Sequence, residues 1–497
     1  MNKDAVAEMS QQYQVEAAEK LVPEGYKQTE VGVTNSSGTN LNATCGGPQG
    51  GGMDSRRIPE GWKVESFGEL FSIIDGDRGA NYPSSSDFND YGYCLFLSAS
   101  NVTKTGFKFD NILFIDEGRD RLLSKGKLVR NDIVLTTRGT VGNFAYYNHS
   151  VPYLNLRINS GMVIIRNDGN QVTNNFAYAV FRSNIITQQI EKLTFGSAQP
   201  QLTVSGIRSF LIYYPESQKE QTAIARALSD TDALLSELEK LIAKKQAIKT
   251  ATMQQLLTGR TRLPQFANHP DGSKKGYKQS ELGEIPEDWK VGTYGEIFNF
   301  LTTSTNSRSD LSIHAEYGYI HYGDIHTLWN NFLDLNKTNT PKIDPLLVRS
   351  AFVQDGDLVM ADASEDYEGI GKSIEIKNIG NKSIVAGLHT YLLRDSYSFF
   401  VDGFRGYLHQ VPAVKSMIDK LATGMKVYGI SKRNLEGIYL PIPSKKEQTA
   451  IATILSDMDE EIQALEHRLN KTRQIKQGMM QELLTGKTRL IVGGKNV

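Results

Sequence analysis

The stretch Lys219–Leu263 reads KEQTAIARALSDTDALLSELEKLIAKKQAIKTATMQQLLTGRTRL, and it recurs at Lys446–Leu490 as KEQTAIATILSDMDEEIQALEHRLNKTRQIKQGMMQELLTGKTRL. The two segments lie 227 residues apart and are identical at 25 of 45 positions, far above chance. Self-similarity at a fixed separation indicates a duplicated architecture, so the rest of the chain is best examined for a second copy of every feature.

A shorter motif marks the start of each copy. IPEGWKV at Ile58–Val64 matches IPEDWKV at Ile285–Val291, again 227 residues apart. The chain therefore contains two units of equal length, 58–263 and 285–490, whose middles show almost no similarity. A shared frame with divergent middles predicts one architecture that carries two different specificities. Drift after an ancient duplication is the alternative.

A third match is displaced from this spacing. GYKQTEVGV at Gly25–Val33 matches GYKQSELGE at Gly276–Glu284 with an offset of 251, which is 24 residues more than 227. The extra residues, Thr34–Arg57, are rich in Gly, Ser and Asn, which predicts a flexible linker. The sequence suggests no function for this insert.

Both copies of the long repeat are predicted to be helices. Each begins with a capping-box pattern, SQKE at Ser217–Glu220 and SKKE at Ser444–Glu447. Each ends with a glycine after Leu-Leu-Thr, at Gly259 and Gly486. About 40 helical residues make a rod of about 60 Å. Heptad spacing predicts a seam between the two helices made of Leu228, Leu235, Leu238, Ile242, Leu455, Ile462, Leu465 and Leu469.

We expect these helices to pack against each other in antiparallel orientation, and two surface helices on separate domains are the alternative. Acidic residues gather in the first half of each predicted helix and basic residues in the second half. This polarity suits the helix dipole, and a surface for partner subunits is the other interpretation.

Composition bounds the class of protein. A chain of 497 residues predicts about two to four domains. Because 55 Lys and Arg face 56 Asp and Glu, any surface for nucleic acid must be a local patch. Two cysteines, Cys45 and Cys94, cannot make a disulfide framework or a cysteine zinc site. No apolar run approaches about 18 residues and no signal peptide is evident, so we expect a cytoplasmic protein.

The divergent middles are predicted to be mixed α/β domains. Short apolar runs such as 132–136 and 373–377 predict strands, and 174–193 and 402–421 predict helices. Loops such as Thr136–Asn143 (TTRGTVGN) combine glycine with the Arg, Thr and Asn side chains that contact phosphates and base edges. Ordinary turns use the same residues and are the alternative for any single loop.

Familiar catalytic signatures are incomplete in this sequence. GIGKS at Gly369–Ser373 resembles the end of a phosphate-binding loop, but Asp366 stands where that motif needs its first glycine. His314, His321, His326 and His389 lie in the second middle without an HExxH pattern or a cysteine partner, so we expect polar contacts and no metal. The sequence therefore predicts no chemistry by this chain alone.

The paired entry motifs, the doubled repeat ending in TG(R/K)TRL and the loop GSAQPQL at Gly196–Leu202 resemble the specificity subunit of type I restriction–modification enzymes. The resemblance covers about 58–490. The second unit departs from it in the loop ATGMKVYGIS at Ala422–Ser431, and the insert at 34–57 also departs.

The resemblance implies two target recognition domains that each read one half of a split site in double-stranded DNA. Two antiparallel helices would set the gap between the halves and dock modification subunits, two of them expected. These partners would carry S-adenosylmethionine and methylate adenine, and restriction subunits would use ATP and Mg. The resemblance implies no catalytic residue, metal or cofactor in this chain.

The expected fold class is α+β: a tandem pseudo-repeat of two mixed α/β target recognition domains, each followed by a long helix, with the helices packed as an antiparallel coiled coil. The expected boundaries are an N-terminal segment 1–57 with the insert 34–57, recognition domain 58–215, helix 216–262, linker 263–284, recognition domain 285–442, helix 443–490 and tail 491–497.

Candidate DNA contacts are polar residues in the loops of the two middles. In the first domain they are Arg78, Asn81, Ser98, Asn101, Arg138, Thr140, Asn143, Gln199 and Gln201. In the second they are Asn306, Arg308, His321, Tyr322, His326, Lys372, Lys426 and Tyr428. Two other functions compete with DNA recognition: a protein–protein scaffold, which would present neutral apolar grooves, and a nuclease that cleaves without partners.

Overall fold

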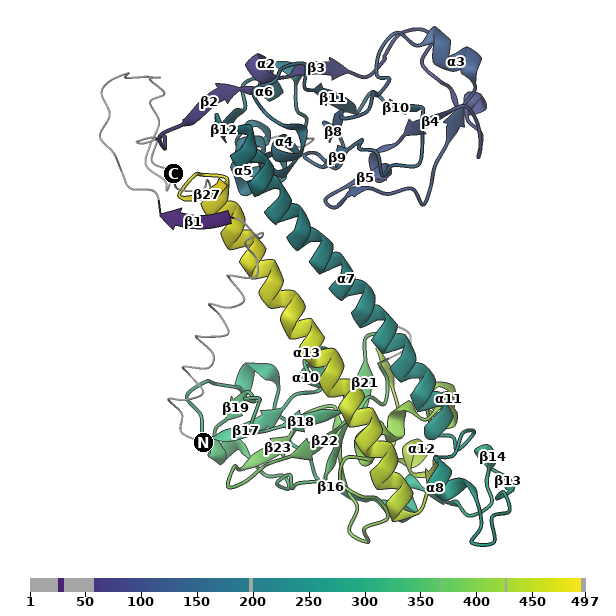
Figure 1. Cartoon of the computed structure of the whole chain (residues 1–497). Coiled ribbons are helices and arrows are strands. Elements are labelled where there is room, and N and C mark those ends of the chain that lie inside the picture. Colours follow the sequence, from purple (N-terminus) through teal and green to yellow (C-terminus); the bar gives the residue numbers. More distant parts are fainter. Residues whose placement is uncertain (1–25, 31–57, 196–199, 368, 425–426, 493–497) are drawn as a thin grey trace. The chain divides into compact units, whose positions relative to one another are not determined.

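The computed structural model describes residues 26–30, 58–195, 200–367, 369–424 and 427–492 (Figure 1). The insert 34–57 and the candidates Gln199 and Lys426 lie outside these residues. Contacts divide the chain into a first unit, 1–238 with 469–497, and a second unit, 239–468. The divisions fall inside both long helices, so each unit contains part of each helix. No helix in the described ranges is long and apolar enough to cross a membrane.

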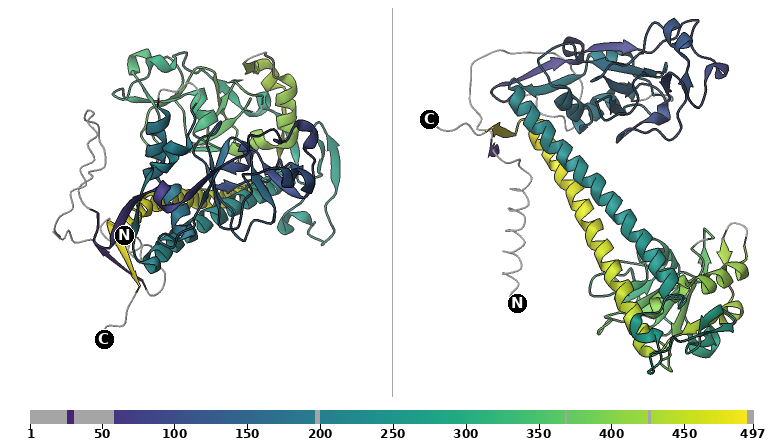
Figure 2. Two further views of the ribbon diagram at one scale, coloured as in Figure 1. Left: turned by 90° about the horizontal axis from the view of Figure 1, so that it is seen from above. Right: turned by 45° about the vertical axis from the view of Figure 1, so that its right-hand side comes forward.

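The two predicted long helices are α7 (Gln218–Leu256) and α13 (Lys445–Leu483), each of 39 residues. They pair in antiparallel orientation within each unit (Figure 2). In the second unit Lys245 contacts Glu461 at 2.6 Å, and Lys249 contacts Asp459. In the first unit Lys476 contacts Asp232 at 2.5 Å.

These ion pairs account for the charge polarity of the helices. The acidic first half of one helix lies beside the basic second half of the other, so opposite charges meet along an antiparallel pair. Lys476 and Asp232 are the repeat counterparts of Lys249 and Asp459 at the 227-residue offset. The separation of acidic from basic residues along each helix therefore has a role within the chain, because it brings opposite charges together between the two helices.

The eight predicted seam residues differ in burial. Leu235 and Leu465 are half-buried. The other six are buried: Leu228, Leu238, Ile242, Leu455, Ile462 and Leu469.

Each unit completes its apolar core with both helices. In the first unit the core includes Leu228, near the start of α7, and Leu484, just after the end of α13. In the second unit the core includes Leu455, near the start of α13, and Leu257, just after the end of α7. The helices therefore pack on the globular domains at their ends as well as on each other.

An ion pair joins the two helix ends in each unit, and in the second unit it is fully buried. In the second unit the Arg262 guanidinium, just after α7, donates to both carboxylate oxygens of Glu447 in the first turn of α13, at 2.6 and 2.8 Å. Trp289 Nε1 donates to the same carboxylate at 2.9 Å. In the first unit Arg489 donates to Glu220 at 2.5 and 2.6 Å. The arginine and the glutamate thus recur in both copies of the repeat.

This geometry corrects the predicted capping boxes. The hydroxyls of Ser217 and Ser444 accept from the backbone N–H of Glu220 and Glu447, at 3.4 and 3.3 Å. The glutamate carboxylates bind the arginines instead of returning to the helix N-cap, because a guanidinium offers two charged donors in parallel.

A glutamine next to each of these glutamates anchors the start of the helix. Gln221 and Gln448 are fully buried. Gln221 Oε1 accepts from the backbone N–H of Thr173 at 2.6 Å, and Gln448 Oε1 accepts from that of Val401 at 2.8 Å. The K-E-Q-T-A-I-A sequence therefore recurs because it fixes the helix to the preceding domain.

The entry motif packs against the glycine that ends a helix. Gly259 has φ +70°, and a Cβ there would lie 2.4 Å from Pro286 Cγ and 3.1 Å from the Trp289 ring. Gly486 has φ +69°, and its Cβ would lie 2.8 Å from Pro59 and 2.9 Å from Trp62. The left-handed conformation and the close approach both require glycine. The entry motif IPExWKV and the helix-end motif LLTG therefore recur together because they pack against each other.

The two divergent middles share one sheet topology despite their dissimilar sequences. The first unit has a four-stranded sheet, a three-stranded sheet and a strand pair: β3 (Ser72–Asp75)-β11 (Met162–Arg166)-β8 (Ile133–Thr136)-β9 (Phe144–Tyr146), β10 (Leu156–Ile158)-β4 (Cys94–Leu97)-β7 (Phe114–Ile115), and β12 (Leu211–Pro215)-β2 (Trp62–Ser66).

The second unit repeats these three sheets, with the strand β18 added to the larger one. Its sheets are β16 (Asn299–Leu301)-β24 (Thr390–Arg394)-β20 (Leu358–Ala361)-β22 (Ser373–Lys377)-β18 (Phe332–Asp334), β19 (Lys342–Ile343)-β17 (Tyr317–Ile320)-β23 (Ile384–Ala386), and β15 (Lys290–Thr293)-β26 (Tyr439–Ile442). The one parallel pair of the smaller sheet, β10 with β4, has its counterpart in β23 with β17. The fold is thus retained where the sequence is not.

The predicted helices of the middles are each interrupted. The segment 174–193 forms α4 (Asn174–Phe181) and α5 (Asn184–Thr194), with Ser183 as a new N-cap. The segment 402–421 forms a 3₁₀ turn at Arg405–Gln410 and then α11 (Pro412–Leu421). Proline has no N–H and fits the first position of a helix, so α11 starts there.

The displaced YKQ motif pairs differently in the two units. In the second unit β13 (Tyr277–Ser280) forms a hairpin with β14 (Gly283–Pro286). In the first unit β1 (Tyr26–Glu30) pairs in antiparallel orientation with β27 (Thr488–Val492), near the other end of the chain.

Replacing Glu447 with alanine tests the helix-end ion pair. The change leaves Trp289 Nε1 and part of the Arg262 guanidinium buried without an acceptor, although Asp288 still contacts Arg262 at 2.9 Å. We expect the second unit to lose about 3 kcal/mol of stability, measured by native-state hydrogen exchange. Glu460→Ala, at an exposed position of α13, should change it by less than about 0.5 kcal/mol. Equal losses in the two variants would contradict this role.

Replacing Gly259 with alanine tests the packing of the entry motif. Gly272→Ala is the matched control, because Gly272 also has a positive φ, +86°, but a Cβ added there would meet no atom of the described residues within 4 Å. Both variants carry the cost of left-handed backbone, about 1–2 kcal/mol. We expect Gly259→Ala to lower the stability of the second unit by about 1–3 kcal/mol more, measured by hydrogen exchange, because the methyl overlaps Pro286.

Candidate DNA-binding surfaces

Three of the first-unit candidates gather on loops at one end of the four-stranded sheet. With its amide oriented so that the oxygen faces the guanidinium, Gln201 accepts from Arg138 Nη2 and Nε at 2.9 and 3.2 Å. The backbone N–H of Arg138 donates to Gly161 at 3.3 Å. Arg78 donates to the neighbouring Ser160 carbonyl at 3.2 Å. All three candidate side chains are exposed, so this cluster offers two guanidiniums and an amide to a ligand.

Several other first-unit candidates hold their own loops together. Asn101 is 2% exposed, and its Nδ2 donates to the carbonyls of Lys108 and Asn111 at 3.0 and 2.9 Å. Ser98 donates to Asn101 Oδ1 at 2.8 Å. Asn143 Nδ2 donates to a backbone carbonyl, that of Val102, at 3.0 Å. Asparagine in turns commonly satisfies backbone groups in this way, so the amides of Asn101 and Asn143 are already used within their loops.

Asn81 and Thr140 are exposed candidates with weaker ties to the protein. Asn81 Nδ2 donates to the Leu122 carbonyl at 3.3 Å. The carbonyl of Thr140 accepts from the Thr136 hydroxyl, which closes the loop after β8 and leaves the Thr140 side chain exposed. Both remain predicted contacts.

In the second unit an aromatic cluster forms around Tyr322, at the start of α10 (Tyr322–Thr327). Its ring centre lies 4.7 Å from that of His321, 6.3 Å from His326 and 5.5 Å from His389. Arg308 contacts this cluster, because its Nη2 lies 3.1 Å from His321 Nδ1 and also binds the Asp324 carboxylate. The Arg308 side chain remains more than half exposed, at 57%.

The remaining second-unit candidates adjoin this cluster through the strand β21 (Ala363–Ser364). His326 Nε2 contacts the Ala363 carbonyl at 2.9 Å, and Lys372 donates to the His326 carbonyl at 3.2 Å. Tyr428 lies in β25 (Tyr428–Gly429), which pairs with β21 so that Tyr428 faces Ser364. Asn306 instead accepts from Ser304 within its own turn, at 2.7 Å. The structure therefore brings six candidates from distant segments together: Arg308, His321, Tyr322, His326, Lys372 and Tyr428.

Burial lowers the pKa of two groups in this cluster. Burial and the nearby Arg308 lower the pKa of His321, which holds the ring neutral at pH 7 and suits its acceptance of the Gly323 N–H at 3.0 Å. Burial also lowers the pKa of Lys372. Arg308 is the most exposed of these three side chains.

The clusters of the two units lie on equivalent loops. Leu202 N–H donates to Thr137 O at 3.0 Å in the first unit, and Ile430 N–H donates to Asp362 O at 3.0 Å in the second. Thr137 N–H in turn donates to Gly161 O at 2.8 Å, and Asp362 N–H donates to His389 O at 3.1 Å. The loops that these backbone hydrogen bonds hold are therefore equivalent, but they carry different side chains in the two units.

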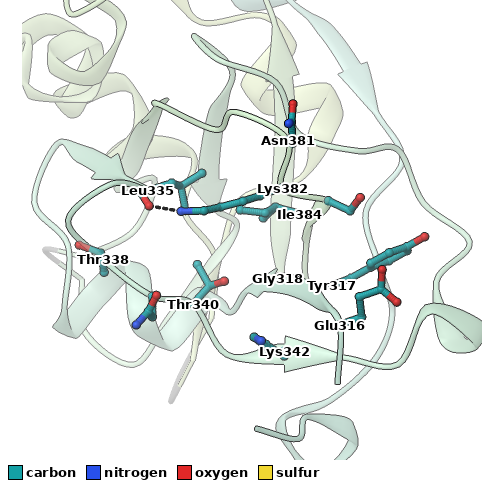
Figure 3. Close-up of a pocket in the computed structure, with 12 residues that line it drawn as sticks. Glu316, Tyr317, Gly318, Leu335, Thr338, Thr340, Lys342, Asn381, Lys382 and Ile384 are labelled. Atoms are coloured by element: carbon teal, nitrogen blue, oxygen red, sulfur yellow. Dashed lines mark hydrogen bonds between the residues drawn. The ribbon is translucent and has the colours of Figure 1, made fainter. Parts of the chain in front are cut away.

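A polar pocket of about 310 Å³ lies elsewhere in the second unit, against β17, β19 and β23 (Figure 3). Lys342, Glu316 and Asn381 are among its lining residues, and Lys382 donates to the Leu335 carbonyl across it. None of the predicted second-unit contacts lines this pocket.

Sequence reasoning missed the ion pairs at the helix ends and the position of His389. Arg262, Arg489, Glu220 and Glu447 fix the helix ends, and their signal was their recurrence as charged residues at identical repeat positions. The sequence marks His389 only as one of four histidines, because its backbone conformation and its neighbour Asp362 are visible only in the fold.

Known proteins of one kind resemble this chain. A family model described as "Type I restriction modification DNA specificity domain" matches it twice, at 59–250 and 286–476. The putative type I restriction enzyme MjaX specificity subunit of Methanocaldococcus jannaschii is 25% identical over 451 residues, which cover 87% of this chain and 95% of that protein. The type I restriction enzyme EcoDI specificity subunit of Escherichia coli is 24% identical over 258 residues, covering 49% of this chain and 50% of that protein.

Solved structures show the same fold. The crystal structure of the type I restriction–modification S subunit from M. genitalium has a TM-score of 0.52 and 15% identity, with 87% of this chain and 98% of that chain covered. A chain from a structural study of complex assembly and conformational transition of the type I R-M system has a TM-score of 0.50 and 16% identity, with 87% and 99% covered. Because the family model matches both units over more than half of the sequence, the chain belongs to the type I restriction–modification DNA specificity family and is a specificity subunit with two tandem recognition domains.

Proposed function

We propose that this subunit reads a bipartite site in double-stranded DNA, with residues 58–215 reading one half and residues 285–442 the other. The observation that carries the proposal is the contrast between frame and loops. Both units repeat the same topology and the same helix-end ion pairs, whereas equivalent loops present different side chains. One frame with two sets of readers is what a site with two different halves requires.

The chemistry of the two clusters supports base and phosphate contact. Exposed Arg138 and Gln201 in the first unit offer donors and an acceptor 2.9 Å apart, and exposed Arg78 binds the carbonyl of Ser160, next to Gly161. Arginine and glutamine are the side chains that pair bidentately with guanine and adenine in the major groove. In the second unit Arg308, Tyr322 and the adjoining histidines offer a different combination.

The helices 216–262 and 443–490 act in this proposal as the spacer that sets the gap between the two half-sites. The ion pairs and the buried seam residues within each unit make the helix pair stiff, and a stiff element converts a fixed number of residues into a fixed gap. Segment 263–284 links the first helix to the second domain, and 1–57 and 491–497 flank the repeat.

The partners in this proposal are two modification subunits docked on the frame, and restriction subunits beyond them. The modification subunits bind S-adenosylmethionine and flip an adenine out of the duplex to methylate it. ATP, Mg and cleavage belong to the restriction subunits. This chain contributes recognition without catalysis, and the complex acts on DNA in the cytoplasm.

A protein–protein scaffold fits the same frame less well. Such a scaffold needs apolar grooves, whereas the clusters on the equivalent loops present guanidinium, amide and imidazole groups. These groups suit a polyanion with hydrogen-bonding base edges.

The experiment that tests this function is co-expression of the chain with its cognate modification subunit in a host without adenine methylation. The host genome is then sequenced for N6-methyladenine. We expect one split motif, two short defined halves around a gap of constant length. Methylation at a continuous motif, or a stable complex that methylates nothing, would contradict the proposal.

Exchanging residues 58–215 for the corresponding domain of a relative with another specificity separates the two halves. Because each half is read by one domain, we expect the exchange to change one half of the methylated motif and to leave the other half and the gap length unchanged. Changes in both halves would show that the domains do not read independently.

Replacing Arg138 with alanine tests the first-unit cluster. Loss of a bidentate reader should cost about 1–3 kcal/mol of binding at one base position and relax the motif there. Arg121→Ala is the matched control, because Arg121 is a highly exposed arginine that pairs with Glu117 on the short helix Glu117–Leu122. Binding is measured with the complex of this chain and its modification subunit on fluorescent duplexes. Unchanged affinity and motif in Arg138→Ala would remove it from the contact set.

A further inference from the structure

His389 has a backbone conformation that is uncommon for residues other than glycine. It precedes β24 and has φ +58°, in the left-handed region. A side chain in this region costs free energy, and such residues gather where a ligand or a substrate must be contacted. A glycine would avoid the cost, so the imidazole itself needs an explanation.

Two neighbours hold the His389 ring in place. Its Nδ1 lies 3.4 Å from Asp362 Oδ1, and the Tyr322 ring meets it edge-on at 78°, with the ring centres 5.5 Å apart. The imidazole is half exposed, at 51%. Because Nδ1 faces the carboxylate, Nε2 lies on the opposite edge of the ring, where no hydrogen-bond partner is found among the residues that the structure describes.

The other histidines of the cluster lack this arrangement. His321 is 8% exposed and its Nδ1 accepts from Gly323. His326 uses Nε2 to contact the Ala363 carbonyl. His389 therefore combines an ordered ring with an exposed edge whose nitrogen can meet a ligand, as a residue that reads a ligand must.

The first unit places a different side chain at the same point of the fold. The shared backbone bonds make Gly161 the counterpart of His389 and Thr137 the counterpart of Asp362, so Arg138 corresponds to Ala363. A Cβ added to Gly161 would lie 3.7 Å from Arg138 Cβ. The first unit thus has the large side chain of Arg138 opposite Gly161. The second unit has the small side chain of Ala363 opposite His389.

We propose that His389 is a base-reading residue of the second recognition domain and takes the place that Arg138 has in the first. The proposal rests on the proposed function and deepens it. In the neutral ring with its proton on Nδ1, toward Asp362, Nε2 is the acceptor. The donors on base edges in the major groove are the exocyclic amino groups of adenine and cytosine, and Nε2 accepts from one of these.

Replacing His389 with glycine tests the proposal without straining the fold. Glycine adopts φ +58° freely and stands at the equivalent position of the first unit, so H389G should fold as the wild type does. In the co-expression experiment we expect the motif to relax at one base position of one half, with the other half and the gap unchanged. Affinity of the complex for a duplex with the full site should fall by about 5- to 150-fold.

Two further variants separate reading from folding. Asp362→Asn keeps the size of the side chain but removes the carboxylate that orients the ring, so it should relax the same position to a smaller extent. His314→Ala replaces an exposed histidine of the same unit and should leave motif and affinity unchanged. Thermal unfolding midpoints of the variants serve to verify that each is folded.

The outcomes distinguish this inference from the function on which it rests. A split motif in the wild type together with an unchanged motif and affinity in H389G would overturn the role of His389 and leave the proposed function standing. Absence of a split motif in the wild type would overturn the proposed function. Loss of methylation at every site by a folded H389G protein would also overturn a role limited to one base.

Discussion

The buried pairing of Arg262 with Glu447, repeated as Arg489 with Glu220, is the interaction on which the rest of the structure depends. It joins the end of one long helix to the start of the other, across 185 residues in the second unit and 269 in the first. With the end-glycine and the entry tryptophan packed beside it, each unit gains a complete junction of strand, helix start and helix end. Because breaking a buried ion pair costs several kcal/mol, such a junction resists change. This explains why the sequence repeats at its entry motif and its helices.

The middles do not form this junction, and they differ in sequence while they keep the order of their strands. The loops that carry the candidate readers are held by equivalent backbone hydrogen bonds, so a side chain can be exchanged without moving the loop. At the same position of the fold, the first unit has Arg138 beside Gly161 and the second unit has Ala363 beside His389. Under the proposed function, the frame provides stability and the loops provide recognition, so each domain can change its readers independently of the other.

Much of the fold was predictable from local pattern. Heptad spacing and end-glycines predicted the long helices, and repetition predicted two units of one architecture. The candidate sites were harder to predict, because the residues that contact each other there are distant in the sequence. A glutamate three residues after serine predicts a cap, whereas Glu220 binds Arg489. Asn101 and Asn143 belong to residue types that serve turns and base contacts equally, and here they hold backbone carbonyls. His389 was recognisable only from its φ and from Asp362.

Hydrogen–deuterium exchange tests most directly whether DNA binds the reader loops and leaves the helix-end junctions unchanged. It is measured on the complex with the modification subunit, with and without a duplex that carries the methylated motif. The account predicts that DNA slows exchange in the reader loops, 137–143 and 159–161 in the first unit and 362–372 and 387–390 in the second. Exchange at the helix-end junctions, 257–263 and 484–490, should stay as it is without DNA. Protection centred on the junctions, or on the pocket at 316–342, with unchanged reader loops would contradict it.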